Sequence, residues 1–146
     1  MISFDVLTRR PSALTARDLE RVASAVTRGL KLKGSVSVSL SFVSEPAMRR
    51  LNKEQMHKDR PTDVLAFPMD TLFVPPGEAR SLGDLVVCPV YAEREARRRS
   101  IPPKEELARL IIHGTLHLVG YDHDTPAKES RMFALQERML ESAFRL

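Results

Sequence analysis

Three histidines close together near the C-terminus are the residues of this sequence best suited to chemistry. His113 and His117 are four residues apart, and His123 follows after Gly120, which allows the chain to turn. Side chains at positions i and i+4 of a helix lie about 6 Å apart along one face, so two imidazoles can reach one ion. Three neutral imidazoles with a fourth position open to water form a common catalytic zinc site. The pattern predicts one zinc ion per chain, bound by His113, His117 and His123.

The ligand spacing resembles the zinc peptidase pattern H-E-x-x-H-x-x-G-x-x-H, with one difference. Gly114 stands where a peptidase carries the glutamate that acts as general base. A bound metal would still lower the pKa of water toward about 7 and polarise a substrate oxygen. The missing carboxylate disfavours a peptidase. A phosphodiester is the alternative substrate, because its reaction gains from cationic stabilisation of the phosphoryl oxygens. The sequence identifies no catalytic residue that moves the proton.

A helix from about Lys104 to Val119 is predicted to carry the first two histidines. Pro102 and Pro103 suit a first helical turn, and Gly120 suits the position after the last one. This helix is apolar over most of its circumference, which is typical of a buried helix. Its narrow polar strip consists of Glu106, Arg109, His113 and His117.

The spacing of apolar residues also predicts the elements that support this helix. Strands are expected at residues 2–6, 35–42, 64–67 and 85–88. The first helix is expected after the N-cap Thr15, with apolar positions from Leu19 to Leu30 and its end marked by Gly34, and further helices are expected at 44–52, 91–99, 104–119 and 127–143. Loops are expected at residues 53–63 and around Pro75, Pro76 and Gly77. This order favours an α+β fold. We expect a single domain over residues 1–146, with a small mixed sheet backed by helices and a zincin-like metal helix near the C-terminus.

The composition is that of one ordinary globular domain without disulfides. The chain has 146 residues, 42% of them hydrophobic, which is enough for a sizeable core. Cys88 is the single cysteine; it is expected on a strand in the core and fits a reducing compartment. The sequence has no apolar run of about 20 residues and no signal-peptide pattern, so we expect a soluble cytoplasmic protein without a membrane partner. The net charge of +4 weakly favours a nucleic acid partner, and no particular oligomeric state is predicted.

A basic run lies on the helix expected at residues 91–99. It consists of Arg94, Arg97, Arg98 and Arg99. Such a run is usually a solvated helix face, and the alternative is part of an RNA track. Aromatic residues are scarce, so no platform for stacking bases is evident.

Four aspartates have both a structural and a functional interpretation. Asp63 and Asp84 either cap their strands, or accept a proton or orient a metal ligand. Asp122 and Asp124 flank His123, where either a solvated turn or a hydrogen bond to a ligand imidazole is expected.

Three blocks of sequence follow in order between about Leu51 and the C-terminus. Asp59 with PTDVLAFP at residues 61–68 is close to D-x-P-T-D-V-L-S-F-P. LGDLVV at residues 82–87 resembles L-G-D-I-V-I, and the run at residues 113–123 resembles H-G-x-L-H-L-x-G-Y-D-H. With these three blocks the chain resembles the YbeY family of bacterial rRNA maturation factors.

The resemblance implies a zinc-dependent endoribonuclease specific for single strands, whose three histidines bind the metal. It implies roles in rRNA processing, small-subunit maturation and ribosome quality control, with single-stranded RNA, rRNA and the small ribosomal subunit as partners. Two alternatives remain. One is a non-enzymatic RNA-binding ribosome assembly factor with a structural zinc, and the other, less favoured, is a zinc metallopeptidase.

One residue departs from the family pattern. The family usually has an arginine three residues before the aspartate that matches Asp59, and this chain has Met56 there. The resemblance makes that arginine a candidate for contact with substrate phosphate. Lys58 is a substrate-binding candidate here, together with Arg97 and Arg98, although a lysine lacks the bidentate fork of a guanidinium. The departure predicts a weak nuclease with an intact metal site.

Overall fold

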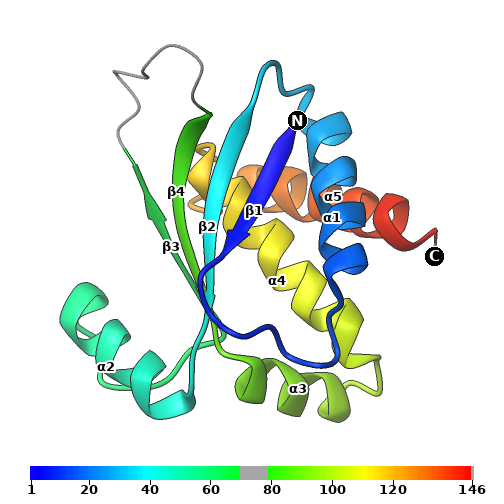
Figure 1. Cartoon of the computed structure of the whole chain (residues 1–146). Coiled ribbons are helices and arrows are strands. Elements are labelled where there is room, and N and C mark those ends of the chain that lie inside the picture. The colour runs from blue at the N-terminus through cyan, green and yellow to red at the C-terminus, as the bar shows by residue number, and fades with distance from the viewer. Residues whose placement is uncertain (70–78, 146) are drawn as a thin grey trace.

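The computed structural model describes residues 1–69 and 79–145, and the loop predicted around Pro75, Pro76 and Gly77 lies outside them. The described elements are β1 (Ile2–Val6), α1 (Ala16–Leu30), β2 (Val36–Phe42), α2 (Glu45–Met56), β3 (Val64–Pro68), β4 (Arg80–Val87), α3 (Pro89–Arg98), α4 (Pro103–Leu118) and α5 (Pro126–Phe144). One sheet backed by helices confirms the predicted α+β class (Figure 1).

The sheet is mixed, as predicted, with strand order β1-β2-β4-β3. β1, β2 and β4 are parallel, and β3 runs antiparallel to β4 at the edge. Along β2, every second side chain is buried and the serines between them are half-buried. This alternation places one apolar face of the sheet against the helices.

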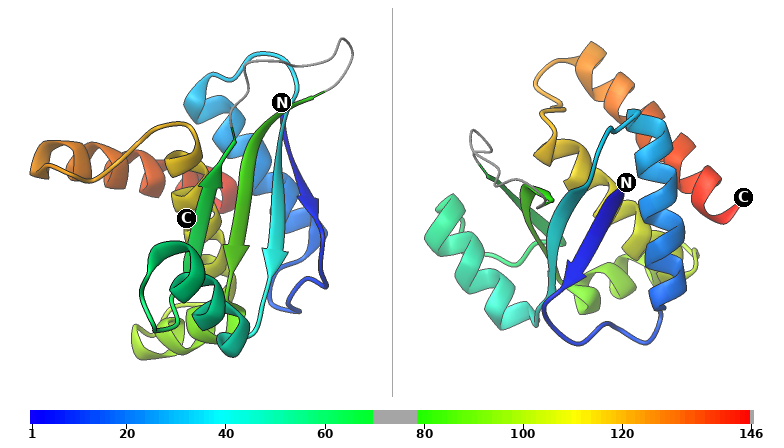
Figure 2. Two further views of the ribbon diagram at one scale, coloured as in Figure 1. Left: turned by 90° about the vertical axis from the view of Figure 1, so that its left-hand side faces the viewer. Right: turned by 45° about the horizontal axis from the view of Figure 1, so that its top comes forward.

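Three of the helices, α1, α4 and α5, position the histidines by packing in two layers on that face (Figure 2). α1 lies against β1, α4 lies against β3 and β4, and α5 packs across both helices. Leu107, Ile111, Ile112 and Leu116 of α4 are inaccessible to solvent. The prediction of a buried helix is therefore confirmed. None of the described helices is long and apolar enough to cross a bilayer.

The predicted boundary between the second helix and the following loop is wrong. α2 continues to Met56, although a loop was expected from residue 53, and it ends where His57 adopts a left-handed conformation with φ 58°. Three of the residues at 53–56 are polar, and this polarity indicated a loop. Lys, Glu, Gln and Met are nevertheless good helix formers, and here they form a solvated helical turn.

The start of β4 and the place of Cys88 also differ from expectation. β4 begins at Arg80 instead of residue 85, because Gly83 interrupts its apolar pattern without ending the strand. Gly83 has φ 134°, and a Cβ atom there would overlap the carbonyl oxygen of Phe67 on β3. Cys88 is buried as expected but precedes α3 as its N-cap residue instead of lying on a strand.

Candidate metal centre

The structure brings the three predicted ligands together. His113 and His117 lie on the last two turns of α4, and the loop after Gly120 (φ 99°) returns His123 to them. The ring centroids of His113 and His117 are 4.6 Å apart. The ring centroid of His123 is 5.3 Å from that of His117 and 6.4 Å from that of His113. His113 and His117 are half-buried, and His123 is exposed.

The two helical imidazoles are held in the same tautomer. His113 Nδ1 lies 2.8 Å from Gln136 Oε1, and His117 Nδ1 lies 3.0 Å from the carbonyl oxygen of Tyr121. Both oxygens can only accept, so each Nδ1 carries a proton and donates it. The Gln136 amide is itself oriented, because its Nε2 donates to Glu137 at 3.1 Å. Both histidines therefore present an unprotonated Nε2 when their rings are neutral.

The two Nε2 atoms point at one another at 3.1 Å. Two lone pairs at this distance repel unless a cation lies between them. Zinc bonds of 2.0–2.1 Å in a tetrahedron require ligand nitrogens about 3.3 Å apart, which is close to the observed separation. Burial lowers the pKa of His117, and the neighbouring His113 lowers it further, which favours the neutral, ligating form. His113 and His117 therefore fit a shared metal ion.

The arrangement is not that of a complete coordination shell. Among residues 1–69 and 79–145, no three His, Cys, Asp or Glu side chains form a group that could hold an ion as they stand. His123 is the exposed member of the trio and lies on the loop between α4 and α5. Its ring would have to move toward the other two to complete a three-histidine site.

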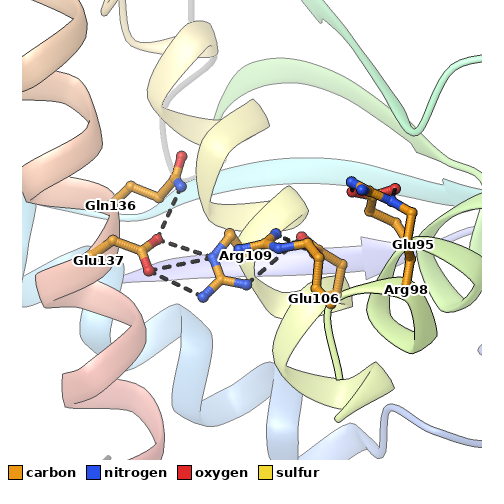
Figure 3. A network of polar contacts seen from close by, with 7 residues as sticks. Glu95, Arg98, Glu106, Arg109, Gln136 and Glu137 are labelled. Atoms are coloured by element: carbon orange, nitrogen blue, oxygen red, sulfur yellow. Dashed lines mark hydrogen bonds and ion pairs between the residues drawn. The ribbon is translucent and has the colours of Figure 1, made fainter. Parts of the chain in front are cut away.

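Gln136, which contacts His113, belongs to a chain of polar and charged groups that continues through Glu137 and Arg109 (Figure 3). Gln136 contacts Glu137, and Arg109 binds both carboxylate oxygens of Glu137 through Nε and Nη2, each at 3.0 Å. Burial raises the pKa of Glu137, but hydrogen bonds from Arg109 and Gln136 outweigh this and hold the pKa below its ordinary value. Glu137 is therefore a charged acceptor that fixes the Gln136 amide. Sequence reasoning missed Gln136, whose signal was a single amide on the apolar face of the last helix.

Arg109 is held from its other side by Glu106. The Arg109 Nη1 atom is buried without a hydrogen-bond partner among the described residues and lies 3.8 Å from Glu106 Oε1. Glu106 also accepts from Arg99 Nη1 at 2.9 Å. Burial raises the pKa of Glu106, with Arg109 and Arg99 opposing the rise. The polar strip predicted on this helix thus has two functions, since Arg109 and Glu106 anchor the helix while the histidines face a cleft.

The histidines line a cleft of about 340 Å³. The residues around it are Asp63, Val64, Ala66, Arg109, Leu110, His113, Gly114, His117, His123 and Gln136. Asp63 is thus brought to the site, but its Oδ1 accepts from the backbone of Val64 at 2.8 Å, which favours the strand-capping interpretation. Asp84 lines a separate hollow with Leu7 and Gln55.

The aspartates beside His123 do not hold the helical imidazoles. Asp122 accepts from the backbone of Asp124 at 3.3 Å and lies 3.7 Å from Lys128 Nζ. These contacts describe a solvated turn. The partners expected there for the imidazoles are instead Gln136 and the backbone of Tyr121.

The substrate-binding candidates do not line the cleft. Met56 ends α2 and is 39% exposed. Lys58 lies two residues later and is also exposed. Arg97 is exposed on α3, and Arg98 is paired with Glu95. Their contact with RNA stays a prediction.

Gly114 explains in steric terms why this helix lacks a glutamate. A Cβ atom at position 114 would lie 2.6 Å from Leu85 Cδ2 and 3.4 Å from Val64 Cγ2, because α4 passes close over the sheet. We expect Gly114→Glu to lower the free energy of unfolding by at least about 2 kcal/mol, through overpacking and a carboxylate against apolar side chains. Urea unfolding measures this loss.

The same variant tests the peptidase alternative. Gly114→Glu is expected to cleave no unstructured protein in the presence of zinc, since its Cβ atom already overlaps Leu85 and leaves no room for an ordered general base. Gly114→Ala serves as the control, because it adds the Cβ atom without the charge. A stable Gly114→Glu variant with zinc-dependent peptidase activity would contradict this steric account.

The chain is similar to known proteins both in sequence and in fold. A family model described as Endoribonuclease YbeY matches residues 8–143. "Endoribonuclease YbeY" of Nocardioides sp. is 36% identical over 145 residues, covering 95% of this chain and 96% of that protein. "Endoribonuclease YbeY" of Corynebacterium kroppenstedtii is 40% identical over 128 residues, covering 82% of this chain but 62% of that protein. The solution structure of TM1509 from Thermotoga maritima is similar, with TM-score 0.69 and 32% identity, over 99% of this chain and 89% of that one.

Proposed function

This chain belongs to the YbeY endoribonuclease family, and on that premise we propose that it is a zinc-dependent endoribonuclease that cuts single-stranded RNA. The observation that carries the zinc dependence is the 3.1 Å approach of the two Nε2 atoms in the cleft, together with oxygen acceptors at both Nδ1 atoms. We also propose that the protein acts in the cytoplasm on rRNA, in small-subunit maturation and ribosome quality control.

The roles of the chain's own residues follow from the geometry of the cleft. His113 and His117 would hold zinc through Nε2, and His123 would close over it from the loop. When bound, zinc would supply an activated water and polarise a phosphoryl oxygen. Gln136 and the carbonyl group of Tyr121 keep the two helical rings in the ligating tautomer.

The size of the cleft supports a single-stranded substrate. Its volume of about 340 Å³ is at the lower end of the roughly 300–1,000 Å³ typical of small-molecule pockets. One nucleotide splayed out of a single strand fits such a space better than paired bases stacked within a duplex.

The proposal is tested by removing and restoring the metal. Chelated protein, with zero zinc by elemental analysis, is expected to leave a single-stranded rRNA fragment intact. Restored zinc is expected to recover cleavage, and the same RNA annealed to its complement is expected to resist. The measurement is single-turnover cleavage on a gel, because it separates the chemical step from product release.

Two outcomes would contradict the proposal. Cleavage that survives complete removal of zinc would exclude a zinc-dependent nuclease. RNA binding at full zinc content without any cleavage would support the assembly factor, in which zinc only fastens the loop of His123 to α4.

A further inference from the structure

A second polar groove, away from the histidine cleft, lies between α1 and the C-terminal end of α5. The two helices pack side by side, and the end of α5 lies against α1 (Figures 1 and 2). The groove has a volume of about 660 Å³. The charged residues that line it are four arginines and one glutamate, namely Arg17, Arg21, Arg28, Arg145 and Glu20. We call it the α1–α5 groove.

Most of the protein's excess positive charge is in this groove. Its lining carries a net charge of +3, and the whole chain carries +4. Within the described part of the chain, none of its four arginines has a carboxylate within 4.0 Å. Arg28 donates from Nη2 to the neutral Ser142 Oγ at 2.8 Å.

The basic run on α3 contrasts with the groove. Arg94 donates to Glu45 at 3.2 Å, Arg98 pairs with Glu95, and Arg99 donates to Glu106 at 2.9 Å. Three of the four arginines in that run are therefore partly neutralised. The α1–α5 groove is the stronger candidate for an anion.

Arg28 suits its place in the last turn of α1, where the helix dipole favours a cation, but Arg17 and Arg21 do not serve the stability of this helix. Arg17 lies in the first turn of the helix, where the helix dipole disfavours a cation. Arg17 and Arg21 are at positions i and i+4, so their like charges face one another on the helix surface. Glu20 is the one acid in the groove and forms no ion pair with Arg17 or Arg21 within 4.0 Å, so this unfavourable charge pattern indicates a binding site.

We propose that the α1–α5 groove binds phosphates of the RNA backbone, at a site separate from the histidine cleft. This inference rests on the proposed ribonuclease function. A guanidinium fork matches a phosphate with two charge-assisted hydrogen bonds. The core of a protein interface is instead apolar, and none of the large exposed hydrophobic side chains among the described residues lines the groove. These features favour RNA over a protein partner.

The geometry of α5 sets the length of RNA that can occupy both sites. Gln136 contacts His113, and Phe144 lines the groove. α5 advances about 12 Å along its axis between these residues. A stacked strand advances roughly 3.4 Å per nucleotide, so two or three nucleotides over the histidines do not reach the groove. A strand of about twenty nucleotides is long enough to occupy both.

The test compares the salt dependence of binding for two variants with equal loss of charge. The groove variant is Arg17→Gln/Arg21→Gln/Arg28→Gln. The control is Arg9→Gln/Lys33→Gln/Arg50→Gln, whose exposed cations line neither the cleft nor the groove. The ligand is a 2′-O-methyl RNA of about twenty nucleotides, which serves as a poorly cleaved probe. Its Kd for the zinc-loaded protein is measured from low to moderate salt.

We expect the groove variant to bind this probe at least about tenfold more weakly at low salt. The slope of log K against log salt is expected to flatten by about 2, since each phosphate contact on a single strand contributes about 0.7. The control is expected to keep nearly the wild-type slope. Cleavage of a trinucleotide is expected to be unchanged in both variants. Should the triple variant not fold, Arg21→Gln alone is expected to flatten the slope by about 0.7.

Equal slopes in the groove and control variants overturn this inference and leave an acidic protein as the partner of the groove. The proposed nuclease function survives that result if the trinucleotide and the long RNA are still cut. A wild-type protein that cuts neither RNA contradicts the nuclease function instead. In that case, the salt slopes of the two variants still show whether the groove binds RNA.

Discussion

Replacing His117 with alanine is expected to weaken zinc binding by at least about a hundredfold and to abolish cleavage of single-stranded RNA. Zinc binding to four protein ligands is worth roughly 10–16 kcal/mol, so one ligand contributes about 3 kcal/mol. Each 1.4 kcal/mol is a factor of ten in affinity. His117 is also the ring whose centroid lies near both of the others, at 4.6 and 5.3 Å, so no other side chain of the trio can replace it.

The measurement is zinc content after dialysis against buffered free zinc, with single-turnover RNA cleavage in parallel. His57→Asn is the matched control, because it removes the fourth histidine from an exposed left-handed position that asparagine tolerates. His57→Asn is expected to keep one zinc per chain and the wild-type rate. Full zinc retention in His117→Ala would show that the paired Nε2 atoms are not metal ligands.

The part of this site that lies on one helix could be predicted from sequence. A period of 3.6 residues places His113 and His117 on one stripe, and Gly120 marks the turn that brings His123 back. The alternation along β2 likewise predicted which face of the sheet is buried. These features depend only on local geometry, which the order of residues determines directly.

Contacts between elements could not be predicted in the same way. Gln136 reaches His113 because α5 packs across α4 at one particular register, and nothing near His113 in the sequence specifies that register. The charge distribution is a second example. The adjacent arginines of α3 were expected to be a solvated helix face, with an RNA track as the alternative, and the sequence did not show that Glu45 on α2 partly neutralises Arg94. The α1–α5 groove combines arginines from opposite ends of the chain.

Because Gln136 contacts His113, we expect that replacing Gln136 weakens zinc binding although all three histidines remain. Gln136→Met is expected to weaken zinc binding by about 10- to 100-fold, the usual effect of removing a hydrogen-bond partner of a ligating histidine. Methionine has nearly the same shape but offers His113 Nδ1 no comparable acceptor. The ring of His113 can then rotate or carry its proton on Nε2, and either change removes the lone pair that faces His117.

The measurement is competition for zinc with a chromophoric chelator, and the absorption of bound Co²⁺ reports the coordination geometry. Gln55→Met makes the same chemical change at an exposed position on α2 and is expected to leave both readouts unchanged. Glu137→Gln is expected to have a smaller effect, since it keeps the Gln136 amide but weakens the group that orients it.

A purely structural role for Gln136 would give a different result. Gln136 is 2% exposed, so it also fills space between α4 and α5. If it only packed there, a methionine of equal size would fill the same space, and Gln136→Met would leave zinc affinity unchanged. The positioning role predicts the reverse, because an apolar side chain of equal size suits the surrounding core while the imidazole loses its acceptor. Zinc affinity measured beside the melting temperature of the zinc-free protein therefore separates the two.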